Sequence, residues 1–415
     1  MTASLSAPSA RRGGWGMTDA ATSRAATAGT GEPPGAPAVA DQPYAEIRAL
    51  LRAGRNDEAI GRLCRAIVIA PGDLAAKQIL FDAFYQKRDW EAALVLAEEV
   101  SRHSPDSAEA AMFVVATLSN MRRFDESIPR AQAYLKQFGE NVTVLDALKV
   151  AHFYLGQIET AVRHGQRALE LRDFEATRGK TAAISVPAPP PQGRDVIAFS
   201  VWGSNPCYVY GAMINFVLSR SIYPTWTCRY YVDRAVPKGC IAFLKDNGAE
   251  IFAIEDAYPA VGLFQRFLVM NDNSVGRFLV RDCDARLTAG EAALVKAWAD
   301  SGEPFHVIRD HVLHNELMMG CLWGGRTDCG IDIVELMRRY FTFGPTTKYG
   351  HDQRMLGLML WPLIRGHVLV HDKHYMLSGV RTVKLTDPKS RFGAGHQNLD
   401  AVREEVRRLG LPKVD

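Results

Sequence analysis

The sequence predicts a chain of two parts, in which an array of paired helices precedes an α/β domain. Three observations lead to this fold class: a self-similar period of 34 residues that begins at position 40, a Pro-rich stretch near position 190, and an alternation of short apolar runs with helical patterns after it. The length of 415 residues agrees with two or more cores, because single domains usually contain about 100–200 residues.

Charge and composition narrow the possible functions. The formal net charge is +3, and basic residues are interspersed with acidic ones, which gives no electrostatic footprint for nucleic acid. The 7 cysteines form no CxxC pair, and their odd number leaves one over in any full disulfide scheme. No stretch approaches the roughly 20 apolar residues of a transmembrane helix, and the first forty residues lack the apolar core of a secretory signal. We therefore expect a cytoplasmic protein with reduced thiols, no transmembrane segment and no nucleic-acid partner.

Residues 1–39 form a predicted disordered arm. They are rich in Ala, Thr, Ser, Gly and Pro and contain almost no large apolar side chains, so they cannot bury enough surface to offset the entropy of ordering. Met17 is an alternative start of the protein.

Four windows of 34 residues follow, at 40–73, 74–107, 108–141 and 142–175. A small residue recurs at one position of the period, where two paired helices approach too closely for a larger side chain. These small residues are Ala59, Ala93, Ser127 and Ala161. Pro71 and Pro105 are predicted to end the second helix of their windows, and Gly139 and Asp173 stand at the matching positions of the later windows.

On these residues the region 40–175 resembles tetratricopeptide repeats (TPRs), most clearly in its first two windows. The resemblance implies helix–turn–helix units that stack into an array with a concave face, and such a face binds a protein partner or packs on a neighbouring domain. The alternative is an irregular helical bundle, which would not explain the repeated period.

Residues 176–194 form a predicted linker, because their Pro-rich segment around Pro189 resists helix formation, and we expect few contacts across it. After it we expect an α/β domain over residues 195–400 and a C-terminal tail over 401–415. Strands and helices alternate in this domain, which is typical of a largely parallel sheet covered by helices. The predicted strands are Val196–Val201, Cys228–Val232, Glu250–Ile254, Phe278–Val280 and Phe305–Ile308, and the predicted helices are Tyr208–Arg220, Cys240–Asn247 and Ala289–Asp300.

The segment most informative about chemistry is Asp282-Cys283-Asp284, which follows an apolar strand. In open α/β sheets, ligands collect at the carboxyl ends of strands. Asp282 and Asp284 share a face if the backbone stays extended, and a turn would also bring both around one hard cation that bridges a diphosphate. The alternative is that these carboxylates are solvated turn residues or helix caps.

The order and spacing of several segments resemble bacterial GT-A-type glycosyltransferase-like domains with a DxD motif, which are often fused to TPRs. The resemblance covers roughly half of the chain. It implies that Mn2+ or Mg2+, held at Asp282 and Asp284, neutralises the leaving group of a nucleoside diphosphate sugar. The segments that carry it are Phe199–Gly203, Tyr208–Asn215, Tyr223–Asp233, Gln265–Leu268, Asp282–Asp284, Ile308–His311, Gly320–Gly325 and Asp352-Gln353.

The resemblance places Ser200, Trp202 and Gly203 near the nucleotide, since they follow the first strand of the domain. Trp202 either stacks on the base or packs in the core. Arg266 and Arg281 either bind phosphate through their forked donors or form surface ion pairs.

Three further segments are candidates for the acceptor side and for the metal. Asp352 is the first candidate for a general base in an inverting reaction, or for acceptor positioning in a retaining one; the alternative is a helix cap. Asp310, with His311 and His314 close by, either orients the acceptor or lies in a solvated turn. The glycines of Gly320–Gly325 either let a sugar approach or form a tight turn.

A late histidine often completes the metal site in the family that the domain resembles. His371, at the end of the last predicted strand, is the candidate for this third metal ligand, with His374 as its competitor; a structural role at a strand end is the alternative.

The predicted function is therefore the transfer of a hexose or related sugar from a nucleoside diphosphate sugar to a protein or glycan acceptor. The repeats would recruit that acceptor or another protein partner. One alternative is a scaffold whose α/β domain is catalytically degenerate. Another is a metal-dependent phosphohydrolase, which would need more acidic ligands than the sequence supplies.

Overall fold

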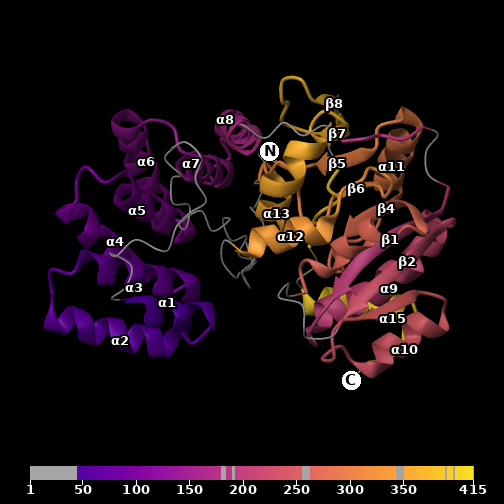
Figure 1. Ribbon diagram of the computed structural model, residues 1–415, viewed down its shortest axis with the longest axis horizontal. Helices are drawn as coiled ribbons and strands as arrows, with labels where there is room; N and C mark the ends of the chain where they lie inside the picture. Colours follow the sequence, from indigo (N-terminus) through magenta and orange to yellow (C-terminus); the bar gives the residue numbers. More distant parts are fainter. Residues whose placement is uncertain are drawn as a thin grey trace, which may run out of the picture.

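The computed structural model describes residues 44–178, 184–188, 192–254, 262–342, 350–387, 390–395 and 398–414. The predictions for the arm 1–39, for Met17 and for the Pro-rich core of the linker around Pro189 lie outside these residues. The helical repeats lie on one side of the molecule and the sheet domain on the other, with α8 between them (Figure 1).

The helical part consists of four helix pairs, α1–α2 to α7–α8, and this stretch of the chain is described throughout. The helices are α1 (Ala45–Arg52), α2 (Asn56–Ile69), α3 (Leu74–Lys87), α4 (Trp90–His103), α5 (Ala108–Asn120), α6 (Phe124–Phe138), α7 (Val142–Tyr154) and α8 (Ile158–Thr177).

The period of 34 residues is visible in the caps of the helices. Asp73, Ser107 and Asn141 are the N-cap residues of α3, α5 and α7, and the side chain of each accepts a hydrogen bond from a backbone N–H in the first turn. The turn within each pair also repeats, because Gly54, Arg88, Arg122 and Gly156 all have a positive φ, between 58° and 76°.

The packing of the pairs confirms the role of the small residues. Ala59, Ala93, Ser127 and Ala161 are all at most 1% exposed. Pro71 and Pro105 lie just beyond the ends of α2 and α4, as expected, and Gly139 caps α6.

The second part is an α/β domain built on a mixed sheet. Among the described residues the sheet has 8 strands in the order β3-β2-β1-β4-β6-β5-β7-β8. All neighbouring strands are parallel except β6, which is antiparallel to both β4 and β5. The strands are β1 (Arg194–Val201), β2 (Trp226–Val232), β3 (Glu250–Ala253), β4 (Val275–Arg281), β5 (Phe305–Arg309), β6 (Trp323–Arg326), β7 (Val368–Asp372) and β8 (Arg381–Lys384).

Strand β6 was not predicted, because its glycines indicate a turn rather than a strand. They are needed for close packing instead: a Cβ on Gly324 would lie 2.5 Å from the carbonyl oxygen of Phe278, and one on Gly325 would lie 2.5 Å from the ring of Phe305. Gly324 and Gly325 are therefore part of the sheet rather than of a tight turn over the core.

Helices cover both faces of the sheet. One core contains Ile197, Phe199 and Leu279 with residues of α9, α10 and α11, and the other contains Val196, Val280 and residues of α12, η4 and α14. Alternate residues of one strand thus enter opposite cores. The helical elements are α9 (Pro206–Ile222), α10 (Lys238–Asp246), η3 (Gln265–Asn271), α11 (Ala289–Ser301), α12 (Ile333–Thr342), α13 (His351–Met355), the π-helical turn η4 (Leu356–Leu360), α14 (Trp361–Ile364) and α15 (Leu399–Arg408).

The prediction of a C-terminal tail over 401–415 is wrong for most of its length. Helix α15 lies in this segment, and its Val402 and Val406 are buried against Cys207 and Ile214 of α9. Glu405 of the same helix forms an ion pair with Arg286 at 2.9 Å. This helix was not predicted because most of its residues are charged and its apolar face is short.

The expectation of few contacts between the two parts is also wrong. Helix α8 does not end at Asp173 but continues to Thr177. Asp173 is buried within the helix and accepts hydrogen bonds from Trp361 Nε1 (2.8 Å) and Arg365 Nε (2.8 Å) of the α/β domain. Leu169 and Ala176 of α8 belong to the same core as the sheet. The last repeat therefore packs on the α/β domain as one of its helical layers.

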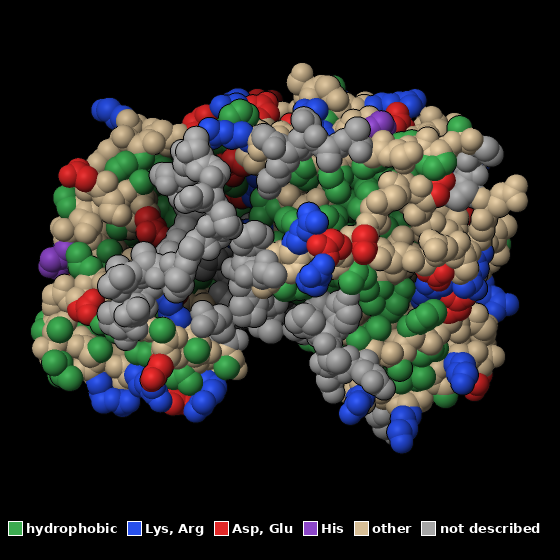
Figure 2. All heavy atoms as spheres, viewed as in Figure 1, with side chains coloured by type: hydrophobic (Ala, Val, Ile, Leu, Met, Phe, Trp, Pro, Cys, Tyr) green, Lys and Arg blue, Asp and Glu red, His purple; other side chains and the backbone are tan. Residues whose placement is uncertain are grey.

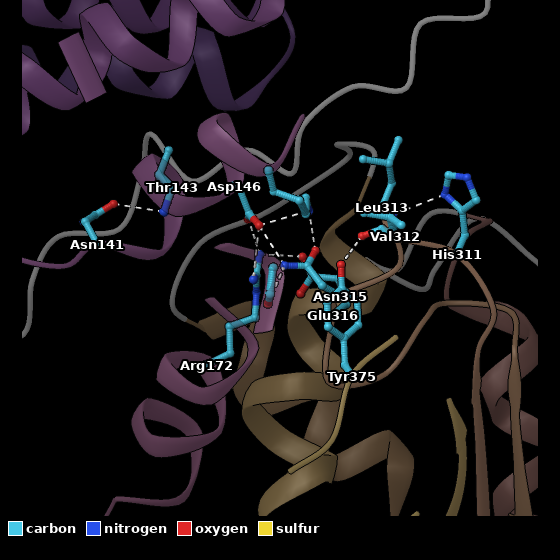
Figure 3. A network of polar contacts seen from close by, with 12 residues as sticks. Asn141, Thr143, Asp146, Arg172, His311, Val312, Leu313, Asn315, Glu316 and Tyr375 are labelled. Carbon is cyan, nitrogen blue, oxygen red and sulfur yellow. Dashed lines mark hydrogen bonds and ion pairs between the residues drawn. The ribbon is translucent and has the colours of Figure 1, made fainter. Parts of the chain in front are cut away.

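A buried ionic network joins α7 and α8 to the segment after β5 (Figure 3). Asp146 accepts hydrogen bonds from Lys149 (3.0 Å), Asn315 (2.9 Å) and Arg172, and Arg172 also binds Glu316 at 2.9 Å. Burial alone would raise the pKa of Asp146, but the charges of Arg172 and Lys149 hold it well below its usual value. Beside the network, Tyr375 packs against Gly165, where a Cβ would lie 2.4 Å from the tyrosine hydroxyl.

The surface agrees with the balanced composition. Acidic and basic side chains are interspersed over the face in Figure 2, without a broad patch of one sign outside the grey atoms. All seven cysteines are free thiols. In the described part of the chain, no helix has both the length and the apolar character that are needed to cross a membrane.

We predict that Asp146→Ala lowers the free energy of unfolding by about 3–5 kcal/mol, because it leaves the buried charges of Lys149 and Arg172 without their shared partner. Glu140→Ala is the matched control, since Glu140 forms an exposed ion pair with Arg167 and should contribute at most about 1 kcal/mol. Urea denaturation of both variants measures the difference. Equal effects would show that the network does not stabilise the junction.

Candidate active site

The candidate site lies where the direction of the sheet order reverses. Strand β1 pairs with β2 on one side and with β4 on the other, so the carboxyl ends of β1 and β4 flank the topological switch point, where α/β sheets form their ligand crevice. Phe199 is the register partner of Arg281, which places the next residues, Ser200 and Asp282, side by side. Both were predicted as site residues.

A buried arginine connects four of the predicted residues. Arg266, in η3, is 3% exposed; its guanidinium binds Asp282 through Nη1 and Asp352 Oδ2 through Nη2 at 2.9 Å. Its backbone N–H donates to Ser200 Oγ at 2.9 Å. Arg266 therefore joins three other segments, that of Ser200 through its backbone N–H and those of Asp282 and Asp352 through its guanidinium.

The charges of the cluster shift its pKa values. Burial raises the pKa of Asp352, the Asp282 carboxylate raises it further, and Arg266 opposes both. Burial would lower the pKa of Arg266, but the two carboxylates raise it overall, so the guanidinium keeps its charge. Asp352 is thus a carboxyl group with an increased affinity for a proton, which is the property of a general base.

Asp352 does not occupy the N-cap position of its helix, so the helix-cap alternative is wrong. The N-cap residue of α13 is Gly350, and the Asp352 side chain turns to Arg266 and to the N–H of Gln353 (2.9 Å). Its place depends on Gly320, where a Cβ would lie 2.2 Å from Asp352 Oδ2 and 3.1 Å from Arg266 Nη2. The glycine backbone approaches the site closely, as the sequence suggested, but the group it admits is Asp352.

Helix α9 holds the Asp282–Asp284 turn in place. Asn215, fully buried on this helix, donates to the carbonyl oxygens of Cys283 (3.1 Å) and Ala285 (2.8 Å) and accepts from the N–H of Leu287 (3.1 Å). Gly211 lets the helix approach, because a Cβ there would lie 2.2 Å from the Cys283 carbonyl oxygen. Asn215 was not predicted as a site residue, since an Asn within an apolar helix carries no signal until its partners are known.

The predicted metal ligands are only partly brought together. Strand β4 ends at Arg281 and the chain bends at Cys283 and Asp284, so the extended arrangement of the two carboxylates is not formed. The Asp282 side chain is 32% exposed, whereas Asp284 is buried near the start of α9. The pKa of Cys207 on α9 is raised by burial and, to a smaller extent, by the charge of Asp284. No group of three His, Cys, Asp or Glu side chains in the described ranges is arranged to hold a metal ion. A hard cation fits at Asp282 if most of its other oxygen ligands come from a diphosphate.

Two predicted residues lie on the wrong face of the sheet. Side chains alternate along β4, so Arg281 points away from Asp282 into the opposite core, where it binds Glu291 at 2.7 Å and backbone carbonyls. His371 on β7 also faces that side, and its Nδ1 is 2.7 Å from Nε2 of His306. Arg281 and His371, predicted as a phosphate contact and a metal ligand, therefore do not lie with Asp282.

The segment after β5 has a structural role at the junction with the repeats. Asp310 is buried; it binds His314 at 2.6 Å and accepts the N–H groups of Phe392 and Gly393. His311 lies against Phe153 of α7, with ring centroids 5.1 Å apart. Asp310 thus fastens the chain before α15 and does not join the Arg266 cluster. His374 lies in the turn after β7, with its N–H bonded to Asp372 at 2.8 Å.

Residues after β1 remain open to a ligand. Trp202 is 43% exposed, which contradicts the core-packing alternative, and its indole lies over Gly262, where a Cβ would be 2.0 Å away. The N–H of Gly203, which has a φ of 70°, donates to both oxygens of Asp233 at 3.1 Å. Asp233 directly follows β2, so it fixes this turn against the end of the neighbouring strand.

The fold and site define a helical-repeat protein with an attached α/β domain, and α1 to α8 have the 34-residue spacing and the paired helices that the resemblance to TPRs implies. No family model and no curated protein matches the chain. Among solved structures, MamA AMB-1 is similar over 30% of this chain and 69% of its own, with 24% identity and a TM-score of 0.28. MamA 41-end from Desulfovibrio magneticus RS-1 is similar over 31% and 72%, with 18% identity and a TM-score of 0.29. A thermophilic TPR protein of Thermus thermophilus, TTC0263, is similar over 32% and 74%, with 17% identity and a TM-score of 0.29.

We predict that Asn215→Ala destabilises the protein by about 1–3 kcal/mol, because it leaves buried carbonyl groups and one N–H without a partner. Ser219→Ala, one turn further along α9, is the control. Its hydroxyl donates to Phe216 O at 2.7 Å within the helix and accepts only from the weak donor Cys228 Sγ, at 3.1 Å, so its loss should cost less than about 1 kcal/mol. Denaturation midpoints compare the two variants. A larger loss in the serine variant would contradict the role given to Asn215.

Proposed function

We propose that this protein is a glycosyltransferase of the GT-A type, which moves a sugar from a nucleoside diphosphate sugar to an acceptor. The observation that carries this proposal is the meeting of Ser200, Arg266, Asp282 and Asp352 at the switch point of the sheet. These residues were selected from the sequence as donor, metal and base positions, and they come from four separate segments. A structural ion pair alone would not require all four to lie at a ligand crevice.

The chemistry of the cluster suits a diphosphate leaving group. Glycosyl transfer releases a nucleoside diphosphate whose negative charge must be stabilised, and preorganised cationic donors serve this purpose. Arg266 supplies a fixed guanidinium at this place. Mn2+ or Mg2+ is the proposed cofactor: Asp282 would hold it, Asp284 is the second candidate, and the ion would neutralise charge on the diphosphate.

Asp352 is the proposed general base in an inverting reaction, or the group that positions the acceptor in a retaining one. Its raised pKa and its contact with Arg266 support this role. Asp310, whose oxygens are taken by His314 and two backbone N–H groups, is no longer a candidate for it.

Trp202 and Gly203 are the proposed nucleoside-binding residues. The exposed indole offers a surface for a base, and the Gly203 turn, held by Asp233, lies next to it.

The repeats are the proposed docking part for a protein or glycan acceptor, or for another protein partner. Tyr154, Leu155 and Ile158 support a protein partner, because these three apolar side chains at the turn between α7 and α8 are each more than a third exposed. The alternative is a scaffold whose α/β domain is catalytically degenerate. The Arg266–Asp282 ion pair favours this alternative, because it already neutralises the carboxylate that a cation would use.

We predict that one of UDP, GDP, ADP and dTDP raises the melting temperature of the full chain when Mn2+ is present, because a ligand that binds only the folded state stabilises it by mass action. Asp282→Asn should abolish the shift, since it removes the exposed carboxylate. Asp195→Asn, at the opposite ends of the strands, should leave it unchanged. The absence of any shift with all four nucleotides, with and without Mn2+, would contradict the glycosyltransferase proposal and favour the scaffold alternative.

We also predict that Asp352→Asn keeps nucleotide binding but lowers sugar transfer by about 100-fold or more, because the amide retains the size of the side chain but not its basicity. Release of the nucleoside diphosphate from its sugar, with water as acceptor, measures the rate. An unchanged rate would mean that Asp352 only places Arg266.

A further inference from the structure

Arg266 has an incomplete set of partners although it is buried. Its Nη1 and Nη2 bind Asp282 and Asp352, but its Nε is buried and has no hydrogen-bond partner among the residues that the structure describes. A buried donor without a partner costs about 1–3 kcal/mol, and an acceptor brought by a ligand would remove that cost. The guanidinium is therefore satisfied on its carboxylate sides only.

A free cation and Arg266 must compete for the same group. Asp282 is the exposed member of the cluster, at 32% exposure, whereas Asp352 is 5% exposed. A divalent ion that arrives from solvent meets Asp282 first and finds it paired with a guanidinium. Binding of the ion alone would separate that pair and leave Nη1 as well as Nε without a partner in a buried place.

A diphosphate changes this balance. Its oxygens are acceptors for the forked donors of an arginine, so the released Nη1 and the unpartnered Nε would both gain a partner. The pair with Asp352 at 2.9 Å and the N–H bond to Ser200 at 2.9 Å keep Arg266 in the site meanwhile. The diphosphate would supply new acceptors to the guanidinium that the cation leaves unpaired. The cation would take the Asp282 carboxylate, which otherwise occupies that guanidinium and repels the diphosphate.

We propose that Arg266 is an internal counter-cation that makes the site bind a divalent cation and a diphosphate together, and each of them poorly alone. This inference rests on the proposed function. It adds that Arg266 selects the cation–diphosphate complex over the free cation. Asp352 acts as the fixed partner of Arg266 while Asp282 is transferred from the guanidinium to the cation.

The test measures Mn2+ binding to the full chain by electron paramagnetic resonance, with and without the nucleoside diphosphate that gives the largest thermal shift, after correction for the Mn2+–nucleotide complex in solution. In the wild type the nucleotide should raise the affinity for Mn2+ by about tenfold or more. In Arg266→Gln, Mn2+ alone should bind about tenfold more tightly than in the wild type, and the enhancement by nucleotide should fall to about twofold or less. Arg266→Lys keeps the charge but not the fork, so Mn2+ alone should remain weak while the enhancement falls.

Arg277→Gln is the matched control, because Arg277 pairs with Asp195 at the amino ends of β1 and β4 and should leave both affinities unchanged. If Arg266→Gln does not fold, as judged by circular dichroism, Asp352→Asn replaces it. Arg266 then has Asp282 as its remaining carboxylate, and Mn2+ alone should bind still more weakly than in the wild type. Independent binding of Mn2+ and nucleotide to the wild type would overturn the inference and leave the proposed function standing. Binding of neither ligand would overturn both.

Discussion

A buried guanidinium requires negative charge around it, and this constraint organises the candidate site. Arg266 satisfies it with Asp282 and Asp352, which brings the end of β4 and the start of α13 to the same place as the end of β1. Gly320 has no side chain, which leaves room for Asp352, and Asn215 holds the backbone of the turn that carries Asp282. The geometry of the crevice thus depends on how one positive charge is paired.

The sheet decides which residues can take part. Because side chains alternate along a strand, Asp282 faces η3 while its neighbour Arg281 faces α11, where it is paired with Glu291. The two buried arginines next to the switch point therefore belong to different ionic clusters. Arg281 stabilises the layer behind the site, and Arg266 remains in contact with the crevice.

Much of the fold was predictable because it repeats or alternates. Each predicted window of 34 residues corresponds to one helix pair, although α8 extends beyond the last window, and the predicted strands from Val196 to Ile308 all exist. Strand β6 was missed because its glycines have the composition of a turn, and α15 because its apolar face is narrow. Sequence order also selected Ser200, Arg266, Asp282 and Asp352, and the structure brings these four residues together. The misplacement of Arg281 and His371 arose because proximity in sequence says nothing about the face of a sheet until the register is known.

Helix α8 belongs to two structures at once, as the second helix of the last repeat and as a layer of the α/β domain. Its Gly165 and Asp173 are fitted to Tyr375 and Trp361 of the α/β domain. Repeat arrays change length in evolution by gain or loss of whole units, because each unit contacts its neighbours alone. In this chain such growth is possible at one end: units can be added or lost before α5, but the unit that contains α7 and α8 is fixed by the domain it supports. Relatives of this protein should therefore differ in the number of their early repeats and share the last one.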